Sequence, residues 1–290
     1  MFPEDIPCQR SAADLIRWGE KRLSEASSDR PRLEAQILLA HTLEVSRDHV
    51  LAGMITDVTD EQARGYCRFV LRRASGTPFA YVLGYQDFYG LRFTVTPATL
   101  VPRPETELLV DVALERLNGM DEPLLIDVCS GSGCAAIAVA YNAPSLRVLS
   151  MDISPEATEV ARHNGAAHGV EDRVCVICAD LLTPVAACSV DIVIANPPYI
   201  RSSEIPNLQT EVRDWEPRIA VDGGPDGMLI HRRLLPQAYM VLRSGGLFAL
   251  EVAAGQAADA ARALRDTGFT AIRSRADLAG HERVVMGIRP

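Results

Sequence analysis

The chain has 290 residues, of which 48% are hydrophobic and 23% are charged, and its formal net charge is −9. These values are typical of a globular protein with one large domain or two domains. The acidic balance argues against a protein held mainly by nucleic-acid phosphates, and no apolar run reaches the ~18 residues that span a bilayer.

Residues 1–76 have the pattern of a helical domain. Ser11 can cap a first helix, Pro31 opens a second, and residues 59–62 have the composition of a capping box before a third. Apolar side chains recur at helical spacing in each segment. The third helix is expected to end near Gly76, and the domain boundary is placed there.

Residues 77–100 are expected to connect this domain to a larger one. Aromatic and β-branched residues dominate positions 79–95 and are interrupted by Gly84 and Gly90. This composition predicts a β-hairpin or two short strands.

Residues 101–290 alternate between strand and helix patterns. Strands are expected at residues 124–128, 147–151, 174–178, 191–195, 247–252, 269–273 and 283–288, with helices between them that include 154–168 and 228–242. Such alternation predicts an α/β domain with a mostly parallel sheet and helices on both faces.

The cysteine content and the N-terminal residues bear on the cellular compartment in which the protein is expected. Seven scattered cysteines favour reduced thiols over a disulfide framework, and residues 1–5 lack the apolar stretch of a signal peptide. Cys175 and Cys178 lie three residues apart on an expected strand, so they face opposite ways and cannot hold one metal ion. We expect a cytoplasmic monomer with no metal site, no membrane contact and no direct contact to nucleic acid.

Acidic residues follow three successive strands of the expected sheet. Asp127 begins a glycine-rich turn with Gly131 and Gly133, Asp152 ends the second strand, and Asp180 follows the third. A carboxylate at the second position can accept both ribose hydroxyls, and one at the third can meet an adenine amine. Taken singly, each acid is more often a helix cap. Together they favour a nucleotide site, and the missing third glycine favours S-adenosyl-L-methionine over NAD.

The segment Asn196-Pro197-Pro198-Tyr199 follows the fourth strand. Two prolines fix two φ angles and remove two backbone donors, so the loop offers carbonyl acceptors, the Asn196 amide oxygen and a flat aromatic face. It therefore suits a planar group with N–H donors, such as a carboxamide or an exocyclic amine. The alternative is a proline-rich turn that only ends a strand.

Over nearly its whole length the chain resembles the PrmC/HemK family of peptide chain release factor glutamine N5-methyltransferases. The likeness is carried by residues 84–90, 101–107, 129–133, 152–155, 196–200, 216–218 and 222–227, beside the N-terminal helices. It implies a seven-stranded class I S-adenosylmethionine-dependent methyltransferase domain (Rossmann-like) with strand order 3-2-1-4-5-7-6 and an antiparallel last strand. It also implies that residues 1–76 dock the substrate and that the target is the glutamine of the Gly-Gly-Gln motif.

The resemblance extends to individual site residues. It implies catalytic roles for Asn196, Pro197 and Tyr199, and substrate contacts by these residues together with Pro198, Arg103 and Glu105. The implied cofactor contacts are Asp127, Cys129, Ser130, Gly131, Ser132, Gly133, Asp152, Ile153, Asp180, Leu181 and Asn196. Cys129 stands where the family commonly has glycine, and a left-handed φ there would cost about 1 kcal/mol or more.

Two other functions remain open from the residues alone. The Asn-Pro-Pro-Tyr segment equally permits an adenine-N6 methyltransferase on DNA or RNA, which the net charge and the lack of a basic target-recognition domain disfavour. A non-catalytic methyltransferase-like scaffold is disfavoured because Asn196, Asp152 and the glycines are intact. A stripe of Arg64, Arg68 and Arg72, at helical spacing, is either a solvated face or a contact for an acidic substrate protein.

Overall fold

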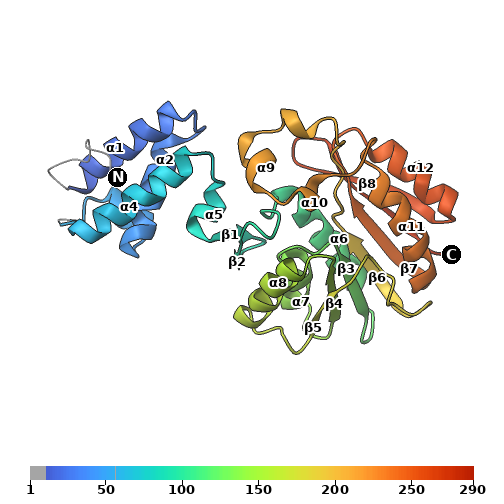
Figure 1. Cartoon of the computed structure of the whole chain (residues 1–290). Helices are drawn as coiled ribbons and strands as arrows, with labels where there is room; N and C mark the ends of the chain where they lie inside the picture. The colour runs from blue at the N-terminus through green and yellow to red at the C-terminus, as the bar shows by residue number, and fades with distance from the viewer. Residues whose placement is uncertain (1–10, 56) are drawn as a thin grey trace. The chain divides into compact units, whose positions relative to one another are not determined.

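The computed structural model describes residues 11–55 and 57–290, so the N-terminal residues 1–5 discussed above lie outside it. The chain forms two compact units, one that runs up to Gly84 and includes Thr210–Trp215, and one made of Tyr85–Gln209 and Glu216–Pro290 (Figure 1). No helix among the described residues is long and apolar enough to cross a membrane.

The first unit is helical, as predicted. Its helices are α1 (Ala12–Glu25), α2 (Pro31–Leu43), α3 (Arg47–Leu51), α4 (Asp60–Ala74), α5 (Phe79–Leu83) and α9 (Thr210–Trp215). The Ser11 side chain accepts from the Asp14 amide at the start of α1, and Thr59 and Gln62 form the expected capping box of α4. Leu15, Leu38 and Tyr66 are fully buried in its core.

One expectation about the connector is wrong in part. Residues 79–83 form the short helix α5 instead of a strand, and Gly84 ends it at a φ of 81°. The predicted hairpin follows as β1 (Tyr85–Phe88) paired with β2 (Leu91–Thr94). Aromatic and β-branched residues suit a strand, but a single helical turn buries the same side chains when it packs on a core. Here Val82 packs into the core of the helical unit.

The second unit contains a seven-stranded sheet. Its strands are β3 (Leu124–Val128), β4 (Arg147–Asp152), β5 (Val174–Cys178), β6 (Val190–Ala195), β7 (Leu242–Glu251), β8 (Thr270–Ala276) and β9 (Glu282–Ile288). Their order is β5-β4-β3-β6-β7-β9-β8, with β9 antiparallel to both neighbours. Counted along the chain, this is the predicted order 3-2-1-4-5-7-6 with an antiparallel last strand. β7 begins five residues earlier than expected.

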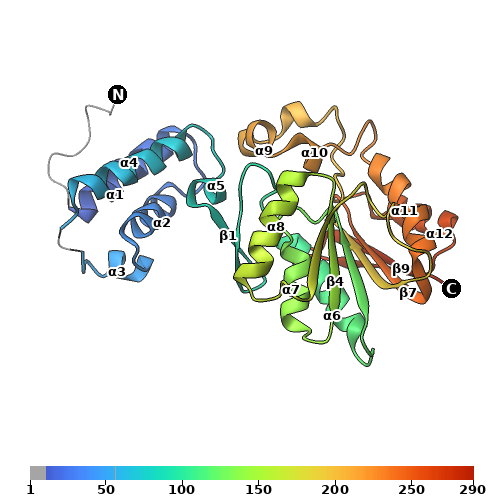
Figure 2. The same ribbon diagram turned by 60° about the horizontal axis from the view of Figure 1, so that its bottom comes forward.

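Helices cover both faces of the sheet (Figures 1 and 2). α6 (Glu107–Leu117) and α7 (Cys134–Asn142) pack on one face, which includes Leu125 and Ile192. α11 (Leu229–Val241) and α12 (Ala257–Thr267) pack on the other, which includes Ile126 and Val193. Alternate residues of one strand thus enter opposite cores, which explains why the strands are continuously apolar. The remaining helices are α8 (Pro155–Ala167), α10 (Arg218–Val221), η1 (Pro104–Thr106) and η2 (Ile205–Asn207).

Candidate active site

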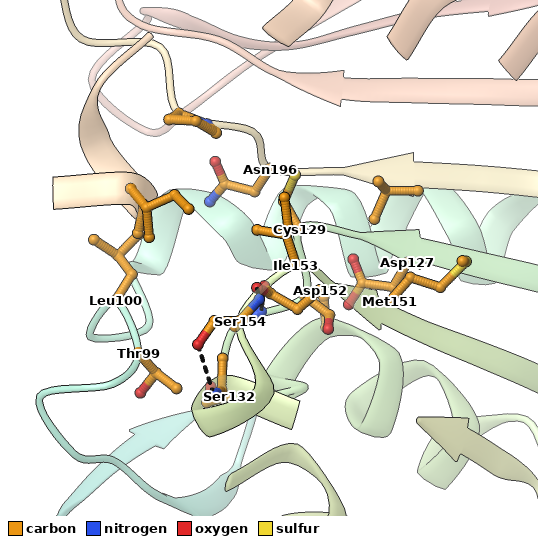
Figure 3. Close-up of a pocket in the computed structure, with 18 of the residues that line it drawn as sticks. Thr99, Leu100, Asp127, Cys129, Ser132, Met151, Asp152, Ile153, Ser154 and Asn196 are labelled. Atoms are coloured by element: carbon orange, nitrogen blue, oxygen red, sulfur yellow. Dashed lines mark hydrogen bonds between the residues drawn. The ribbon is translucent and has the colours of Figure 1, made fainter. Parts of the chain in front are cut away.

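A cavity lies at the carboxyl ends of β3, β4 and β6, within the second unit (Figure 3). Parallel strands all present their carboxyl ends at one edge, where open α/β sheets bind ligands. The predicted site residues on its wall are Arg103, Asp127, Cys129, Ser130, Gly131, Ser132, Asp152, Ile153, Asp180, Leu181, Asn196 and Pro198. Of the predicted residues, Gly133, Pro197, Tyr199 and Glu105 are not part of this wall.

The glycine-rich turn after β3 depends on positive φ angles. Gly131 and Gly133 have φ values of 54° and 77°, which glycine adopts without steric cost. The Gly133 amide donates to the Ser130 carbonyl at 2.8 Å, and α7 begins at the next residue. A Cβ on Gly133 would lie 3.1 Å from Ala161 Cβ, whereas one on Gly131 would meet nothing within 4 Å. Gly133 therefore serves helix packing, and Gly131 leaves room on the cavity side.

Cys129 has a φ of 60°, so it adopts the left-handed backbone conformation that was expected to be costly for a residue other than glycine. A residue with a Cβ in this conformation carries about 1 kcal/mol or more of backbone strain relative to glycine. Burial raises the pKa of the thiol, and the nearby carboxylates of Asp152 and Asp127 raise it further. The sulfur thus remains a neutral thiol beside the cavity.

The acids after β3 and β4 organise the turn. Asp127 is buried, and its Oδ2 accepts from the Ala136 amide of α7 at 3.1 Å. Burial raises its pKa to about 7, with a smaller contribution from Asp152. Asp152 accepts from the Gly131 amide at 2.8 Å and from the Ser154 amide at 2.9 Å. Asp127 therefore joins α7 to the sheet, and Asp152 joins two loops while it lines the cavity.

Asp180 has a partner that the sequence did not reveal. Arg233 of α11 donates to Asp180 Oδ2 at 2.7 Å, and both residues line the cavity. The pair is half-exposed, so its net contribution to stability is small. Arg233 is a candidate ligand contact that local sequence patterns did not identify, because it lies on a helix outside the motifs.

Hydrogen bonds hold Asn196 at the end of β6. Its Nδ2 donates to Thr106 Oγ1 at 3.1 Å, and the Thr106 hydroxyl donates to Glu251 Oε2 at 2.7 Å. The Tyr199 hydroxyl donates to Glu251 Oε1 at 3.3 Å. Asn196 Oδ1 has no partner among residues 11–55 and 57–290, and therefore remains an acceptor at the cavity. Thr106 and Glu251 are additions to the predicted site.

The signal for Glu251 was present in the sheet order. Ala195 of β6 pairs with Leu250 of β7, so the residues that follow them, Asn196 and Glu251, reach the same edge together. The hydrogen-bond partners of Glu251 are Tyr199, in the segment that carries Asn196, and Thr106 of η1.

Arg103 and Glu105 are close in the sequence but have different surroundings. Arg103 lines the cavity and binds Glu216, with Nη2 to Oε2 at 2.6 Å. Glu105 is 4.0 Å from Arg283, outside the cavity wall. Within the described part of the chain no group of three or more His, Cys, Asp or Glu could hold a metal ion.

The cavity has the chemistry that an adenosyl sulfonium cofactor requires. Ser130 Oγ is buried and has no partner among the described residues, so it is available to a ligand. Asp152 supplies a carboxylate. Ile153 and Ile219 line the cavity although 47% and 57% of their surfaces are exposed, which leaves apolar area for a base to cover. The residues present therefore fit such a group.

Sheet order, turn and cavity together define a methyltransferase domain, and the comparisons agree with this class. Residues 14–84 match the family described as the PrmC N-terminal domain, and residues 105–212 match the family described as the methyltransferase small domain. A release factor glutamine methyltransferase of Moorella thermoacetica is 40% identical over 93% of this chain and 95% of that protein. One of Caulobacter vibrioides is 35% identical over 92% and 93%. The chain belongs to the family of release factor glutamine methyltransferases.

A solved structure of a relative is also similar in sequence. The release factor-specific protein-(glutamine-N5) methyltransferase of Alicyclobacillus acidocaldarius is 29% identical and matches 68% of this chain and 99% of its own, with a TM-score of 0.40. The assignment to the family rests on the sequence relatives.

Proposed function

We propose that this protein transfers a methyl group from S-adenosyl-L-methionine to the side-chain amide nitrogen (N5) of the glutamine in the Gly-Gly-Gln motif of peptide chain release factors. It does so as a cytoplasmic monomer and releases S-adenosyl-L-homocysteine. The observation that carries the proposal is the Asn196 amide, whose Nδ2 is engaged by Thr106 while Oδ1 remains an acceptor at the cavity. The names of the relatives that span nearly the whole chain support the substrate.

The chemistry asks the protein to activate a poor nucleophile. S-adenosylmethionine supplies an electrophilic methyl group on its sulfonium. A carboxamide nitrogen has its lone pair delocalised into the carbonyl. Asn196 Oδ1 and the Pro197 carbonyl each accept one N–H of the substrate amide, which directs the nitrogen lone pair toward the methyl group. Because the N–H groups become more acidic as the nitrogen becomes pyramidal, these acceptors stabilise the transition state more than the ground state.

The other loop residues have supporting roles. Pro198 keeps the loop rigid, because its ring fixes φ. Tyr199 is held through its hydroxyl by Glu251, and its ring completes the substrate-binding loop. The segment contains no general base, and the proton leaves to water after the transfer.

The residues proposed to hold the cofactor are those that line the cavity. Asp152 would accept the ribose hydroxyls, Asp180 and Leu181 would contact the adenine, and the turn from Cys129 to Ser132 would face the methionine portion. Ile153 supplies apolar contact to the base. The position of these residues at adjoining strand ends supports the assignment.

In the same proposal, each of the three parts of the chain has its own role. Residues 1–76 dock the protein substrate, residues 77–100 connect, and residues 101–290 carry out the transfer. The match of residues 14–84 to a family-specific N-terminal domain supports a dedicated role for this region.

A labelling experiment tests the function. Purified protein and S-adenosylmethionine with a labelled methyl group are incubated with a purified release factor or with duplex DNA. We expect label in the release factor only, and peptide mapping should locate it on the glutamine of Gly-Gly-Gln. Label in DNA alone would favour the adenine-N6 alternative instead.

The variant Asn196→Ala tests the site itself. Cofactor affinity, measured by calorimetry, should stay within a few-fold of the wild type, whereas turnover should fall by roughly 10²–10³, as is typical when one preorganised group is deleted. Near-normal turnover would show that Asn196 does not have this role.

A further inference from the structure

Three segments that are distant in sequence meet behind Asn196. Thr106 belongs to η1, Glu251 ends β7, and Tyr199 follows β6. Thr106 and Glu251 are 4% and 1% exposed, so their hydrogen bonds are shielded from water. The series runs from Asn196 Nδ2 to Thr106 Oγ1 (3.1 Å) and from the Thr106 hydroxyl to Glu251 Oε2 (2.7 Å). Tyr199 donates to the second carboxylate oxygen.

When Glu251 is ionised, the donors and acceptors of these hydrogen bonds can be arranged in only one direction. A carboxylate has acceptors only, and a threonine hydroxyl has a single proton. The Thr106 hydroxyl must therefore use that proton to donate to Glu251. The Thr106 oxygen is left with lone pairs, so it can only accept from Asn196. The Asn196 side chain must then turn its NH₂ group toward Thr106 and its oxygen away from it.

This direction matters because the C=O and NH₂ ends of an asparagine amide have nearly the same shape. A half-turn of the amide group would exchange its oxygen and its NH₂ group with little change in packing. An NH₂ group aimed at the substrate would meet the substrate's own N–H donors, and the acceptor would be lost. Figure 3 shows the Asn196 amide at the cavity, with its oxygen and nitrogen on opposite sides.

We propose that Thr106 and Glu251 are positioning residues that fix the Asn196 amide with its oxygen toward the substrate. This inference rests on the proposed function, because the orientation matters only for an N–H donor. Thr106 lines the cavity, but its hydroxyl is engaged between Asn196 and Glu251, so both residues act on the substrate through Asn196.

The burial of Glu251 supports a role beyond stability. Removing a carboxylate from water is unfavourable unless its hydrogen bonds compensate it, and an apolar side chain of similar size would pack at the end of β7 without that cost. Its two side-chain donors, Thr106 and Tyr199, are both next to or within the segments that form the site. With an apolar residue at this position, the Thr106 hydroxyl would lose its acceptor and its orientation toward Asn196 would no longer be fixed.

Matched variants of Thr106 test the proposal. Thr106→Val keeps the shape and removes the hydroxyl, whereas Thr106→Ser keeps the hydroxyl. With a release factor as substrate, we expect Thr106→Val to lower kcat by about tenfold or more. KM for the release factor and Kd for S-adenosylmethionine should change by less than about threefold. Thr106→Ser should restore kcat to within about threefold of the wild type.

The outcomes separate positioning from mere stability. A Thr106→Val protein with wild-type kcat, or a Thr106→Ser protein as impaired as Thr106→Val, would overturn the proposal. If Thr106→Val does not fold, Glu251→Gln decides. Burial raises the pKa of Glu251 to about 7, with opposing smaller effects of Glu105 and Arg283. The ionised carboxylate sets the direction of the series, so wild-type kcat should rise as the pH passes through 7. Glu251→Gln should lack this rise, and its persistence would contradict the proposal.

A measurement without a release factor distinguishes this inference from the proposed function. The exchange of the Asn196 side-chain NH₂ protons with water can be followed by NMR in the cofactor-bound protein. The bond to Thr106 should slow exchange in the wild type and in Thr106→Ser, and Thr106→Val should speed it at least about tenfold. Equal exchange in all three would overturn the inference. A failure to methylate the release factor, with this pattern intact, would instead overturn the proposed function alone.

Discussion

Arg103 and Glu216 form an ion pair across 113 residues of sequence, in which Arg103 Nη2 lies 2.7 and 2.6 Å from the two carboxylate oxygens. Glu216 is only 6% exposed, and the Val101 amide also donates to it at 3.4 Å. The pair thus joins two of the motifs by which the sequence resembles its family. Arg103 lines the cavity, but its guanidinium already has a partner within the protein.

Removal of Arg103 should therefore affect stability first. Arg103→Met leaves a buried carboxylate without its cation, and we expect the free energy of unfolding to fall by about 3 kcal/mol. The double variant Arg103→Met with Glu216→Leu removes both charges and should lose less than the single variant. Urea denaturation of both proteins measures this coupling. Simple addition of the two single effects would show that the ion pair is not what matters.

Asp152 offers a test of the cofactor site. Asp152→Ala removes the proposed ribose acceptor and the bonds to the Gly131 and Ser154 amides. Since charge-assisted hydrogen bonds contribute about 1.5–3 kcal/mol each, Kd for S-adenosylmethionine should rise by roughly 10- to 100-fold. Isothermal calorimetry gives the value. Asp172→Ala, which changes an exposed acid before β5, is the control and should bind as the wild type does. An unchanged Kd for Asp152→Ala would refute the ribose assignment.

Cys129 tests the backbone of the glycine-rich turn. Cys129→Gly removes roughly 1 kcal/mol of strain but gives the unfolded chain more freedom, which costs about 0.4–1 kcal/mol. Its free energy of unfolding should therefore stay within about 1 kcal/mol of the wild type. Cys129→Val places a β-branched residue at a φ of 60° and should lose about 2 kcal/mol. Chemical denaturation compares the three proteins, and equal stability of the valine variant would show that the turn relaxes to another conformation.

Much of the fold was predictable because buried parallel strands are short apolar runs with sharp ends. Residues 124–128 and 174–178 were placed without error for this reason. The start of β7 was not, because Gly245 favours a turn locally. In the folded chain Leu242 pairs with Val190, and Gly245 donates its amide to the Arg289 carbonyl at 2.7 Å. Pairing with strands distant in sequence overrides the local preference there.

The site residues could be predicted only where a general rule links the position of a residue in the sequence to its position in the fold. Acids at strand ends reach one sheet edge, so Asp127, Asp152 and Asp180 could be expected to line one cavity, and they do. The bond between Thr106 and Glu251 spans 145 residues, and no local pattern encodes it. The same is true of Arg233, which reaches Asp180 from a helix with no motif.

The arginine stripe of α4 is a proposed contact for the substrate protein. Arg64, Arg68 and Arg72 are exposed, whereas their neighbour Arg73 is buried in ion pairs with Glu34 and Glu211. The triple change of the exposed arginines to glutamate should raise KM for an intact release factor by about tenfold and leave KM for a short glutamine peptide unchanged. Arg262→Glu on α12 is the control for general charge effects. Equal effects on both substrates would reject a docking role for this face.

The pH dependence of stability should reveal Asp127. Burial raises its pKa in the folded protein to about 7, above the ordinary value of 3.8. Between these values the folded protein holds a proton that the unfolded chain has lost, so the unfolded state binds fewer protons. The contribution of this group to stability is thus fully present below about pH 4 and is lost as the pH rises through 7, at up to ~1.4 kcal/mol per pH unit.

The variant Asp127→Asn isolates that contribution. Asparagine keeps an acceptor for the Ala136 amide and does not titrate, so its free energy of unfolding lacks this dependence. Urea denaturation from pH 4.5 to 7.5 should show the wild type losing stability relative to Asp127→Asn as the pH rises. The difference should begin to flatten only at the upper end of this range, as Asp127 becomes ionised in both states. A difference that stays constant across the range would mean that Asp127 is already ionised in the folded protein at pH 4.5, with its burial compensated by the amide of α7.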